Sequence, residues 1–453
     1  MKRKLFLALL LVLSKSAFSQ SASIDATFAI GNGFNISSAV STIAIQSDNK
    51  ILVSGVNFSS FNGTSISSNI VRINTNGSFD TAFPNGYVST AYSFAQQTDG
   101  KIVIAGSSGF NFYRIKRFNI NGTIDNTFSV GLNSSDGFNN TIYKIALQSD
   151  GKFIVQGQFT AYGTTTIKQL ARVNSSGSLD TSFNTNINAI TAITQTNGVR
   201  SFTLLASGKI LVATNSTPRL IRLNSDGSLD NTFTSSITNS VDLMTEQTDN
   251  KILIATTFST NSGELVRINS TGTNDGTFTN YSITGGGIND VHQLSTNKIL
   301  ISNYNGATST NRLVRINNNG GVDTSFNIGS GLNNDISKII IQPDGKILIG
   351  GFFASYNGTT KRAILRLIGD SNLSIEDNEI NKIAIYPNPV KEIIYLSNIT
   401  ETEYEIFDIL GKSISKGKTN VNQINVNSLS KGIYILKIKI EENIINQKFI
   451  KEL

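Results

Sequence analysis

The chain contains no cysteine, no tryptophan and a single histidine among its 453 residues. Without cysteine it forms no disulfide and no thiolate metal site, so its stability has to come from a large apolar core. A single histidine, His292, excludes catalytic triads built on histidine and metal sites with several histidines. Without tryptophan, a platform that stacks on sugars would have to use tyrosine or phenylalanine.

Long apolar runs and dense charge are also scarce. Beyond the first residues, no stretch approaches the roughly 20 apolar residues that a membrane-spanning helix needs. Charged residues make up only 15% of the chain, and part of the net charge of +7 comes from Lys2, Arg3, Lys4 and Lys15. Basic residues are therefore too dilute for a nucleic-acid-binding protein. We expect no nucleic-acid partner and no membrane span in the mature chain.

The N-terminus has the pattern of a secretory signal peptide. Basic residues precede an apolar run at residues 5–13, and small residues stand at the −3 and −1 positions before Gln20. We expect residues 1–19 to be removed during export by cleavage between Ser19 and Gln20. The alternative, a permanent membrane anchor, is disfavoured because the run is too short to span a bilayer stably.

One pattern, Arg-x-Asn-x-x-Gly-x-x-Asp-x-x-Phe, recurs along the chain. Its end also opens the mature chain at residues 24–28, and its beginning closes the array at Arg366. Repeats of about 50 residues with short strands are typical of propellers and solenoids. A repeat divided between the two ends predicts a closed ring with Asp25 opposite Arg366. The complete copies are residues 72–83, 117–128, 172–183, 222–233, 267–278 and 315–326.

Each repeat unit is predicted to form four short strands. In the last copy the first three strands are residues 336–342, 346–351 and 363–367. The fourth strand is a Leu-Asp-x-Ser/Thr-Phe segment, such as residues 229–233 in an earlier copy. Asp-Gly and Asn-Gly turns join such strands into an antiparallel meander. Seven copies predict an all-β, seven-bladed β-propeller closed by its N-terminal strand. The lysine after the first turn gives the same count, at Lys50, Lys101, Lys152, Lys209, Lys251, Lys298 and Lys346.

The recurring charged and aromatic residues are predicted to be structural. Arg72 and Asp80 are eight residues apart, which places them opposite each other if the turn is centred near residues 76–77. Strand alternation would put Phe83 on the other face, where it would pack between blades. The same roles are expected for Arg172, Asp180 and Phe183, and for Arg222, Asp230 and Phe233.

The repeated Asp-Gly-Lys-Ile-Leu-x-x-Gly and Arg-Leu-Asn-x-x-Gly-x-Leu-Asp-x-x-Phe segments resemble the delta-sixty repeat of secreted bacterial β-propellers. The resemblance extends over about residues 24–369, and we assign residues 20–369 to the propeller. It implies a fold rather than a reaction, because no biochemical activity is attached to this repeat.

The composition changes after Gly369. Residues 370–381 are polar and acidic, as in a linker, and residues 382–453 contain short strands separated by turns, as in a small β-sandwich. This segment resembles the type A sorting domain of the type IX secretion system of Bacteroidetes. The resemblance implies passage across the outer membrane, removal of the domain, and release or attachment at the cell surface. Its motif residues are Tyr386, Pro387, Asn388, Pro389, Asp408, Gly411, Lys412, Gly432 and Tyr434.

Three features are weak candidates for a site. Oxygen-bearing side chains alternate at Asn224, Asp226 and Asp230, as in a calcium loop, but the Asp226 position is mostly Asn, Ser or Thr in other copies, which indicates turn chemistry. His292 takes the place of Ile or Leu at the end of a first strand, and we expect a tolerated half-buried residue. Residues 110–117 combine aromatic and basic side chains, as either a ligand patch or a variant third strand.

From the sequence we expect a non-enzymatic, secreted or surface-exposed propeller that binds polysaccharide or a surface protein. The alternative is an extracellular polysaccharide hydrolase or lyase that uses carboxylates or tyrosine. No catalytic residues and no cofactor are predicted. The expected partners of the tail are the type IX secretion machinery and its sortase.

Overall fold

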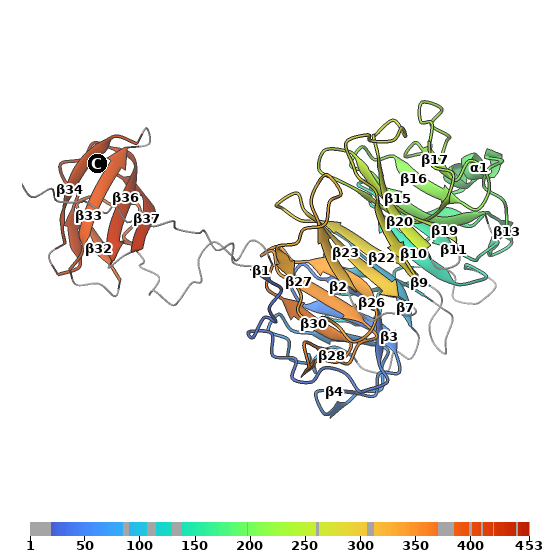
Figure 1. Ribbon diagram of the computed structural model, residues 1–453, viewed down its shortest axis with the longest axis horizontal. Helices are drawn as coiled ribbons and strands as arrows, with labels where there is room; N and C mark the ends of the chain where they lie inside the picture. Colours follow the sequence, from blue (N-terminus) through green and yellow to red (C-terminus); the bar gives the residue numbers. More distant parts are fainter. Residues whose placement is uncertain are drawn as a thin grey trace, which may run out of the picture. The chain divides into compact units, whose positions relative to one another are not determined.

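The computed structural model describes a chain of two compact units, Met1–Leu373 and Ser374–Leu453, which are treated separately (Figure 1). The expected signal peptide, with Ser19, lies outside the described residues. Gln20 begins strand β1 (Gln20–Ser21), which pairs in parallel with β25 (Phe326–Asn327). The described residues are 20–84, 90–106, 115–128, 137–196, 198–259, 262–305, 312–369, 385–397, 401–408, 411–419, 421–440 and 443–452.

The first unit is a propeller of seven antiparallel sheets, each with its strands in chain order. The inner strands are β2 (Ala39–Ile45), β7 (Ala91–Gln96), β10 (Ile142–Leu147), β15 (Val199–Leu204), β18 (Ser240–Glu246), β22 (Gly286–Gln293) and β26 (Ile336–Ile341). The middle strands are β3 (Ile51–Val56), β8 (Ile102–Gly106), β11 (Phe153–Gly157), β16 (Ile210–Thr214), β19 (Ile252–Ser259), β23 (Ile299–Asn305) and β27 (Ile347–Gly351). The third strands are β6 (Ile70–Ile73), β9 (Ile115–Phe118), β14 (Leu170–Val173), β17 (Leu220–Leu223), β20 (Ser262–Ile268), β24 (Leu313–Ile316) and β30 (Ile364–Leu367).

A few short elements decorate these sheets. In the fifth blade β21 (Tyr281–Thr284) adds a fourth strand beside β20. One helix occurs in the described chain, α1 (Thr181–Ala189), and Asp180 caps it by accepting a hydrogen bond from the Phe183 backbone. Three two-stranded hairpins lie between middle and third strands: β4 (Ser60–Phe61) with β5 (Thr64–Ser65), β12 (Ala161–Tyr162) with β13 (Thr165–Thr166), and β28 (Ser355–Tyr356) with β29 (Thr359–Thr360).

The inner strands form a continuous ring. Each inner strand contacts the inner strand of the next blade, and β26 of the last blade contacts β2 of the first. Figure 1 shows the blue first blade beside the orange last blade. The middle strands are apolar on successive residues and buried throughout in β8, β11, β16 and β27, as expected of strands covered on both faces. The apolar core therefore lies between neighbouring blades.

The N-terminal segment closes the ring, as the divided repeat predicts. Ile24 bridges Leu367, and the Asp25 N–H donates to the Arg366 carbonyl at 2.9 Å. The Arg366 side chain then donates to the Asp25 carboxylate at 2.7 Å. This pairing covers a sheet edge that would otherwise be open to other chains.

The fourth strand expected in each unit is shorter than predicted. In blade four, Leu229 forms a single bridge with Leu223, and Asp230 then turns the chain by accepting a hydrogen bond from Thr232 N at 3.0 Å. Aspartate favours such turns because its short side chain bonds the backbone two residues on. The corresponding bridges are Ile73–Phe79, Phe118–Ile124, Val173–Leu179, Ile268–Asn274 and Ile316–Val322.

The second unit is a two-sheet β-sandwich. One sheet contains β31 (Ile385–Tyr386), β32 (Ile393–Leu396) and β35 (Gln423–Asn425). The other contains β34 (Ser413–Lys418), β33 (Glu403–Asp408), β36 (Gly432–Ile440) and β37 (Asn443–Lys451). Its own apolar core includes Ile394, Ile406, Leu436 and Phe449. Within the described chain, no helix is long and apolar enough to cross a membrane.

Candidate functional site

A buried ionic cluster of one Arg, one Asp and one Lys recurs in every blade. The Arg Nε atom donates to Asp Oδ2 at 2.6–2.9 Å, and the Lys Nζ atom lies 2.7–3.2 Å from the same oxygen. Excellent hydrogen-bond geometry is what makes such a buried pair tolerable. The pairs of Arg and Asp are Arg72–Asp80, Arg117–Asp125, Arg172–Asp180, Arg222–Asp230, Arg267–Asp275, Arg315–Asp323 and Arg366–Asp25.

The ionic clusters also join neighbouring blades. Arg172, in blade three, donates to the Ser225 carbonyl of blade four at 2.5 Å, and Arg366 of the last blade donates to the Thr75 carbonyl of the first at 3.0 Å. Burial raises the pKa of Asp25, but hydrogen bonds from Thr27 and Lys346 and the charge of Arg366 outweigh this effect, and the pKa falls to about 2. The clusters are therefore structural links around the ring.

The recurring phenylalanine does not lie on the opposite face from the arginine, as alternation had predicted for Phe83. The Arg72 guanidinium lies over the Phe83 ring at 4.8 Å, and all seven blades repeat this contact at 4.3–4.8 Å. The turn at the aspartate ends the strand alternation, so the phenylalanine side chain lies on the same side as the arginine. Phe83 also touches the next blade, since a Cβ on Gly122 (φ +89°) would lie 2.4 Å from its ring. The packing role between blades holds.

The structure gives the candidate calcium ligands other partners. Asn224 Nδ2 donates to Ser228 Oγ at 2.9 Å, and Asp226 Oδ1 accepts from the Ser228 backbone at 2.9 Å. Asp230 belongs to the ionic cluster of its blade, where Arg222 and Lys209 share Oδ2. The three side chains are thus not brought together as one ligand set.

The blades differ at one repeated position, a β-bulge in the inner strand. In every blade the register between inner and middle strands shifts by one residue near the start of the inner strand. A bulge re-aims a side chain and is frequent beside binding and active sites. Each of these bulge residues is exposed or half-buried: Ser41, Tyr92, Tyr143, Arg200, Asp242, Asn289 and Ser337.

Neighbouring bulge residues contact each other. The rings of Tyr92 and Tyr143 lie 5.7 Å apart at a tilt of 53°, and both are about 40% exposed. Two blades further on, the Arg200 guanidinium forms an ion pair with Asp242. One end of the ring therefore presents an aromatic pair on blades two and three and an ion pair on blades four and five.

The residue after each bulge forms a second, deeper set, which we call the inner polar positions. Asp290 is buried, and its Oδ2 atom lies 2.9 Å from Lys338 Nζ and 3.1 Å from His292 Nε2. The Ile339 N–H of the next blade donates to the same oxygen at 2.9 Å. The position is polar in six blades and is leucine in the fifth; the full set is Thr42, Ser93, Lys144, Ser201, Leu243, Asp290 and Lys338.

The expected environment of His292 needs a correction. His292 pairs with Leu300 of the middle strand. The residue at the same register position in the other six blades is Ala or Thr, except for Ile340 in the last blade, so His292 does not replace a recurring Ile or Leu. His292 is half-buried, as expected, but it borders the Asp290 carboxylate. The aromatic and basic segment at residues 110–117 falls almost wholly outside the described residues, with only its last three residues described.

In the tail, the motif residues make local contacts. Asn388 ties its segment to β37, because Nδ2 donates to the Lys448 carbonyl at 3.0 Å and Oδ1 accepts from the Ile450 N–H at 2.9 Å. Asp408 accepts from the Lys412 backbone at 2.9 Å, and Gly411 holds the turn at φ +82°. Tyr386 and the neighbouring Pro387 and Pro389 are exposed, while Gly432 starts β36 and the Tyr434 ring stacks on Phe449.

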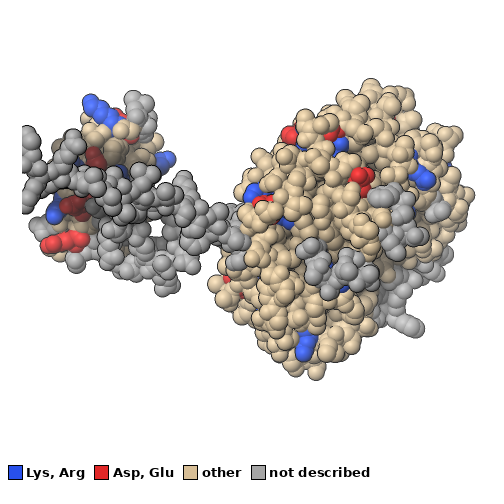
Figure 2. All heavy atoms as spheres, in the orientation of Figure 1, with Lys and Arg blue, Asp and Glu red and all other residues tan. Residues whose placement is uncertain are grey.

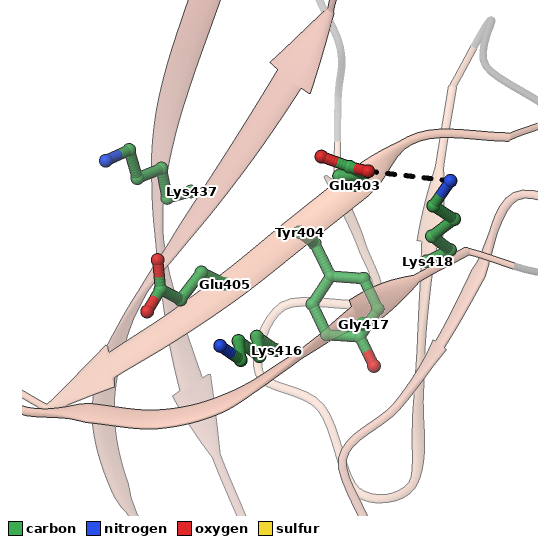
Figure 3. A pocket seen from close by; sticks show the side chains of 7 residues that line it. All are labelled: Glu403, Tyr404, Glu405, Lys416, Gly417, Lys418 and Lys437. Carbon is green, nitrogen blue, oxygen red and sulfur yellow. Dashed lines mark ion pairs between the residues drawn. The ribbon is translucent and has the colours of Figure 1, made fainter.

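A pocket on the tail is lined by Glu403, Tyr404, Glu405, Lys416, Gly417, Lys418 and Lys437 (Figure 3). Glu405 on β33 is opposite Lys416 on one side and Lys437 on the other, and Glu403 pairs with Lys418 at 3.5 Å. Opposite charges across strands stabilise a sheet. The pocket's lining is therefore explained by pairing within the sheet.

Comparison with known families assigns both units. The model described as "Domain of unknown function (DUF5122) beta-propeller" matches seven segments that together cover half of the chain: 46–83, 97–128, 148–183, 205–233, 247–278, 295–326 and 342–373. The chain belongs to the DUF5122 β-propeller family. The secretion system C-terminal sorting domain matches residues 384–452. This DUF5122 propeller thus carries a type IX sorting tail, which directs it to the cell surface or the extracellular space.

Individual relatives are distant. An ulvan lyase, NLR42 of Nonlabens ulvanivorans, is 30% identical over 82 residues, which are 17% of this chain and 15% of the lyase. PorZ, a surface component of the type IX secretion system of Porphyromonas gingivalis, is 11% identical with a TM-score of 0.37, over 92% of this chain and 66% of PorZ. YCF48 from Cyanidioschyzon merolae is 10% identical with a TM-score of 0.44, over 75% of this chain and 97% of that structure.

Sequence reasoning missed the bulge and inner polar positions of this DUF5122 propeller. A signal was present in the sequence, because the equivalent position holds Tyr92 and Tyr143 in two repeats, Arg200 in the next and Asp242 in the one after. The position could not be recognised as a bulge because a bulge is defined by the pairing of two strands, which the sequence does not show. On the face drawn in Figure 2, Lys and Arg lie scattered among Asp and Glu and form no continuous basic patch.

Proposed function

We propose that this DUF5122 propeller is a non-enzymatic binding module that the type IX secretion system delivers to the cell exterior, where it binds polysaccharide or a surface protein. One observation carries the proposal: the residues that recur in all blades hold the ring together, whereas the exposed bulge position varies around the ring among Ser, Tyr, Arg, Asp and Asn. Exposed positions that the framework does not need are free to contact a ligand.

The bulge residues suit a saccharide. Tyr92 and Tyr143 offer two adjacent, partly exposed aromatic faces, which is the platform that a tryptophan-free protein can build for sugar rings. The Arg200–Asp242 pair beside them supplies charge-assisted hydrogen bonds to hydroxyl groups. Both features lie at the same end of the inner strands.

Catalysis is less well supported. A glycosidase needs a carboxylic acid whose pKa is raised so that it can donate a proton. Every described aspartate whose pKa departs from its ordinary value departs downward. Within the described residues, no group of three or more His, Cys, Asp or Glu side chains is arranged to hold a metal ion.

For the tail, we propose recognition by the type IX secretion machinery, removal by its sortase, and either release or attachment of the propeller at the cell surface. The tail supports this role because it has its own apolar core and forms a unit separate from the propeller. Its first motif is fixed to the last strand through Asn388.

The test combines a glycan array with a screen for polysaccharide degradation. The full chain is compared with a Tyr92→Ser/Tyr143→Ser variant, because serine is the natural residue at this position in blades one and seven. We expect the native chain to bind an array glycan and the variant to bind it about tenfold or more weakly, with no reducing ends released by either. Release of reducing ends by the native chain would instead establish the hydrolase or lyase alternative.

A further inference from the structure

Three of the inner polar positions, on separate blades, hold charged residues that lie within electrostatic reach of one another. Lys144 lies on blade three, Asp290 on blade six and Lys338 on blade seven, and the charges of Asp290 and Lys338 both act on the Lys144 ammonium. Blade three neighbours neither blade six nor blade seven in the ring. The three side chains therefore approach one another across the centre of the propeller.

In two blades, the residue at the inner polar position accepts a backbone hydrogen bond from the next blade. In blade two, Ser93 Oγ accepts from the Ile145 N–H of the next blade at 3.2 Å. In blade six, Asp290 Oδ2 accepts from the Ile339 N–H of the next blade at 2.9 Å. A lysine ammonium has only donors and cannot accept such a bond. Lys144 and Lys338 thus depart from the bridging role at this position.

The two lysines differ in their partners. Lys338 Nζ pairs with Asp290 at 2.9 Å. The ammonium of Lys144 has no hydrogen bond or ion pair among the described residues and instead lies over the Phe202 ring at 5.4 Å. Its side chain is only half-buried, so a ligand can reach it. A partly buried ammonium without an anion is costly, and an incoming anion would remove that cost.

Electrostatics of the surroundings agree with this geometry. Burial and the positive charge of Lys338 together lower the pKa of Lys144 to about 8, although the negative charge of Asp290 opposes the shift. Asp290 is already shared by Lys338 and the nearby His292. Two ammonium groups beside one carboxylate leave an excess positive charge in the interior of the ring.

We infer that Lys144 is a binding residue for an oxyanion of the ligand, a carboxylate or a sulfate ester, that enters the ring from the end that carries the bulge residues. The inference rests on the proposed binding function and adds the charge class of its ligand. The exposed Tyr143 precedes Lys144 in the strand, so a sugar ring held by the tyrosines would present its acidic group to the ammonium.

The first test measures the affinity of the full chain by calorimetry for three oligosaccharides of equal length: an oligogalacturonate, a sulfated galactan and a neutral galactan. We expect Lys144→Met to weaken binding of the charged oligomer by about tenfold or more and to leave the neutral oligomer unaffected. The difference between the first two probes identifies carboxylate or sulfate. Lys168→Met is the matched control on the same blade, because the Lys168 ammonium donates to the Asn188 and Ile190 carbonyls.

The second test follows the Lys144 side chain by NMR in inorganic sulfate and in galacturonate. An anion beside the ammonium favours its charged form, so we expect the pKa of Lys144 to rise on addition of the anion. Affinity for the charged oligomer should correspondingly fall as the pH rises from 7 to 9. Lys338, Asp290 and His292 face the same space, so Lys144→Met must abolish this pH dependence.

The outcomes separate the two proposals. Binding that does not distinguish charged from neutral oligomers, and that Lys144→Met leaves unchanged, would overturn the role of Lys144 and leave the binding function intact. A rise in the Lys144 pKa with sulfate, without binding of any oligosaccharide, would support the anion site and contradict a polysaccharide ligand. Failure of both measurements would contradict the anion site at Lys144, and the glycan array then decides the binding function.

Discussion

Arg366 donates a hydrogen bond to Asp25, which lies 341 residues earlier in the chain, and six other blades make the same bond eight residues apart. The same type of Arg–Asp pair thus stabilises six hairpins and also joins the two ends of the ring. The sequence predicted these residue pairs correctly, because the constant spacing of eight residues across a hairpin places Arg opposite Asp. It misled for Phe83, because the turn at Asp80 ends the alternation.

Removal of one aspartate should show the structural role of the ionic clusters. Asp180→Ala strands the buried Arg172 and removes the cap of α1, so we expect the free energy of unfolding to fall by about 3 kcal/mol or more. Chemical denaturation measures it. Asp150→Ala, at an exposed turn of the same blade, is the control and should change stability much less. A stable Asp180→Ala chain that no longer binds ligand would contradict the structural assignment.

The lowered carboxyl pKa values predict acid sensitivity. Asp25 has a pKa near 2 in the folded chain against an ordinary 3.8, so between these values the unfolded chain binds more protons. Its contribution to stability is therefore complete above about pH 4 and is lost as the pH falls towards 2. Melting temperatures between pH 7 and 2 should show a steep drop in this window. Asp25→Asn should make the drop smaller without abolishing it, because the aspartates of the other six clusters also have lowered pKa values. An identical pH profile for both chains would contradict this explanation.

Two segments with the same five residues form different elements, which shows a limit of prediction from a short sequence pattern. Residues 180–184 and 323–327 are both Asp-Thr-Ser-Phe-Asn, yet the first segment enters α1 and the second leads into β25. The residues that follow differ: residues 185–189 continue the helix, whereas Gly329 and Gly331, both with positive φ, follow β25 and exclude a helix there. β25 also pairs with β1, while α1 buries Ile187. The repeat pattern did not predict the helix because the recurring Asp-x-x-Phe segment enters a strand or turn in other blades. It did not predict the bulges because a bulge is a shift in the pairing of two strands, which the sequence of one strand does not show.

The closing segment can be tested as an element. A chain in which residues 20–28 are deleted behind the signal peptide should melt at a clearly lower temperature and associate, because β30 regains an open edge. Asp25→Asn keeps the backbone pairing and should cause a smaller loss. Thermal unfolding and size-exclusion chromatography provide both readouts. If the deleted chain were monomeric and as stable as the native one, the segment would not close the ring.

For the whole molecule, the tail is predicted to be an address that the propeller does not need for folding. The propeller completes its own ring through Ile24 and Leu367. Deletion of residues 382–453 should therefore leave a folded propeller that accumulates in the periplasm of a Bacteroidetes host. Fractionation with immunoblotting measures the location. In the converse experiment, the tail and a signal peptide should carry a fluorescent protein outside the cell. Export of the truncated chain at the native level would contradict the assignment.

The central claim is that repeated residues build the propeller and the variable bulge residues bind its ligand. It is tested most directly by replacing Tyr92, Tyr143, Arg200 and Asp242 together with serine, and by measuring the melting temperature and the glycan-array signal of one preparation. These side chains are exposed or half-buried and the ion pair is on the surface. We predict a melting temperature within about 2 °C of the native chain and loss of the glycan signal. A native glycan signal, or a chain that fails to fold, would contradict the claim.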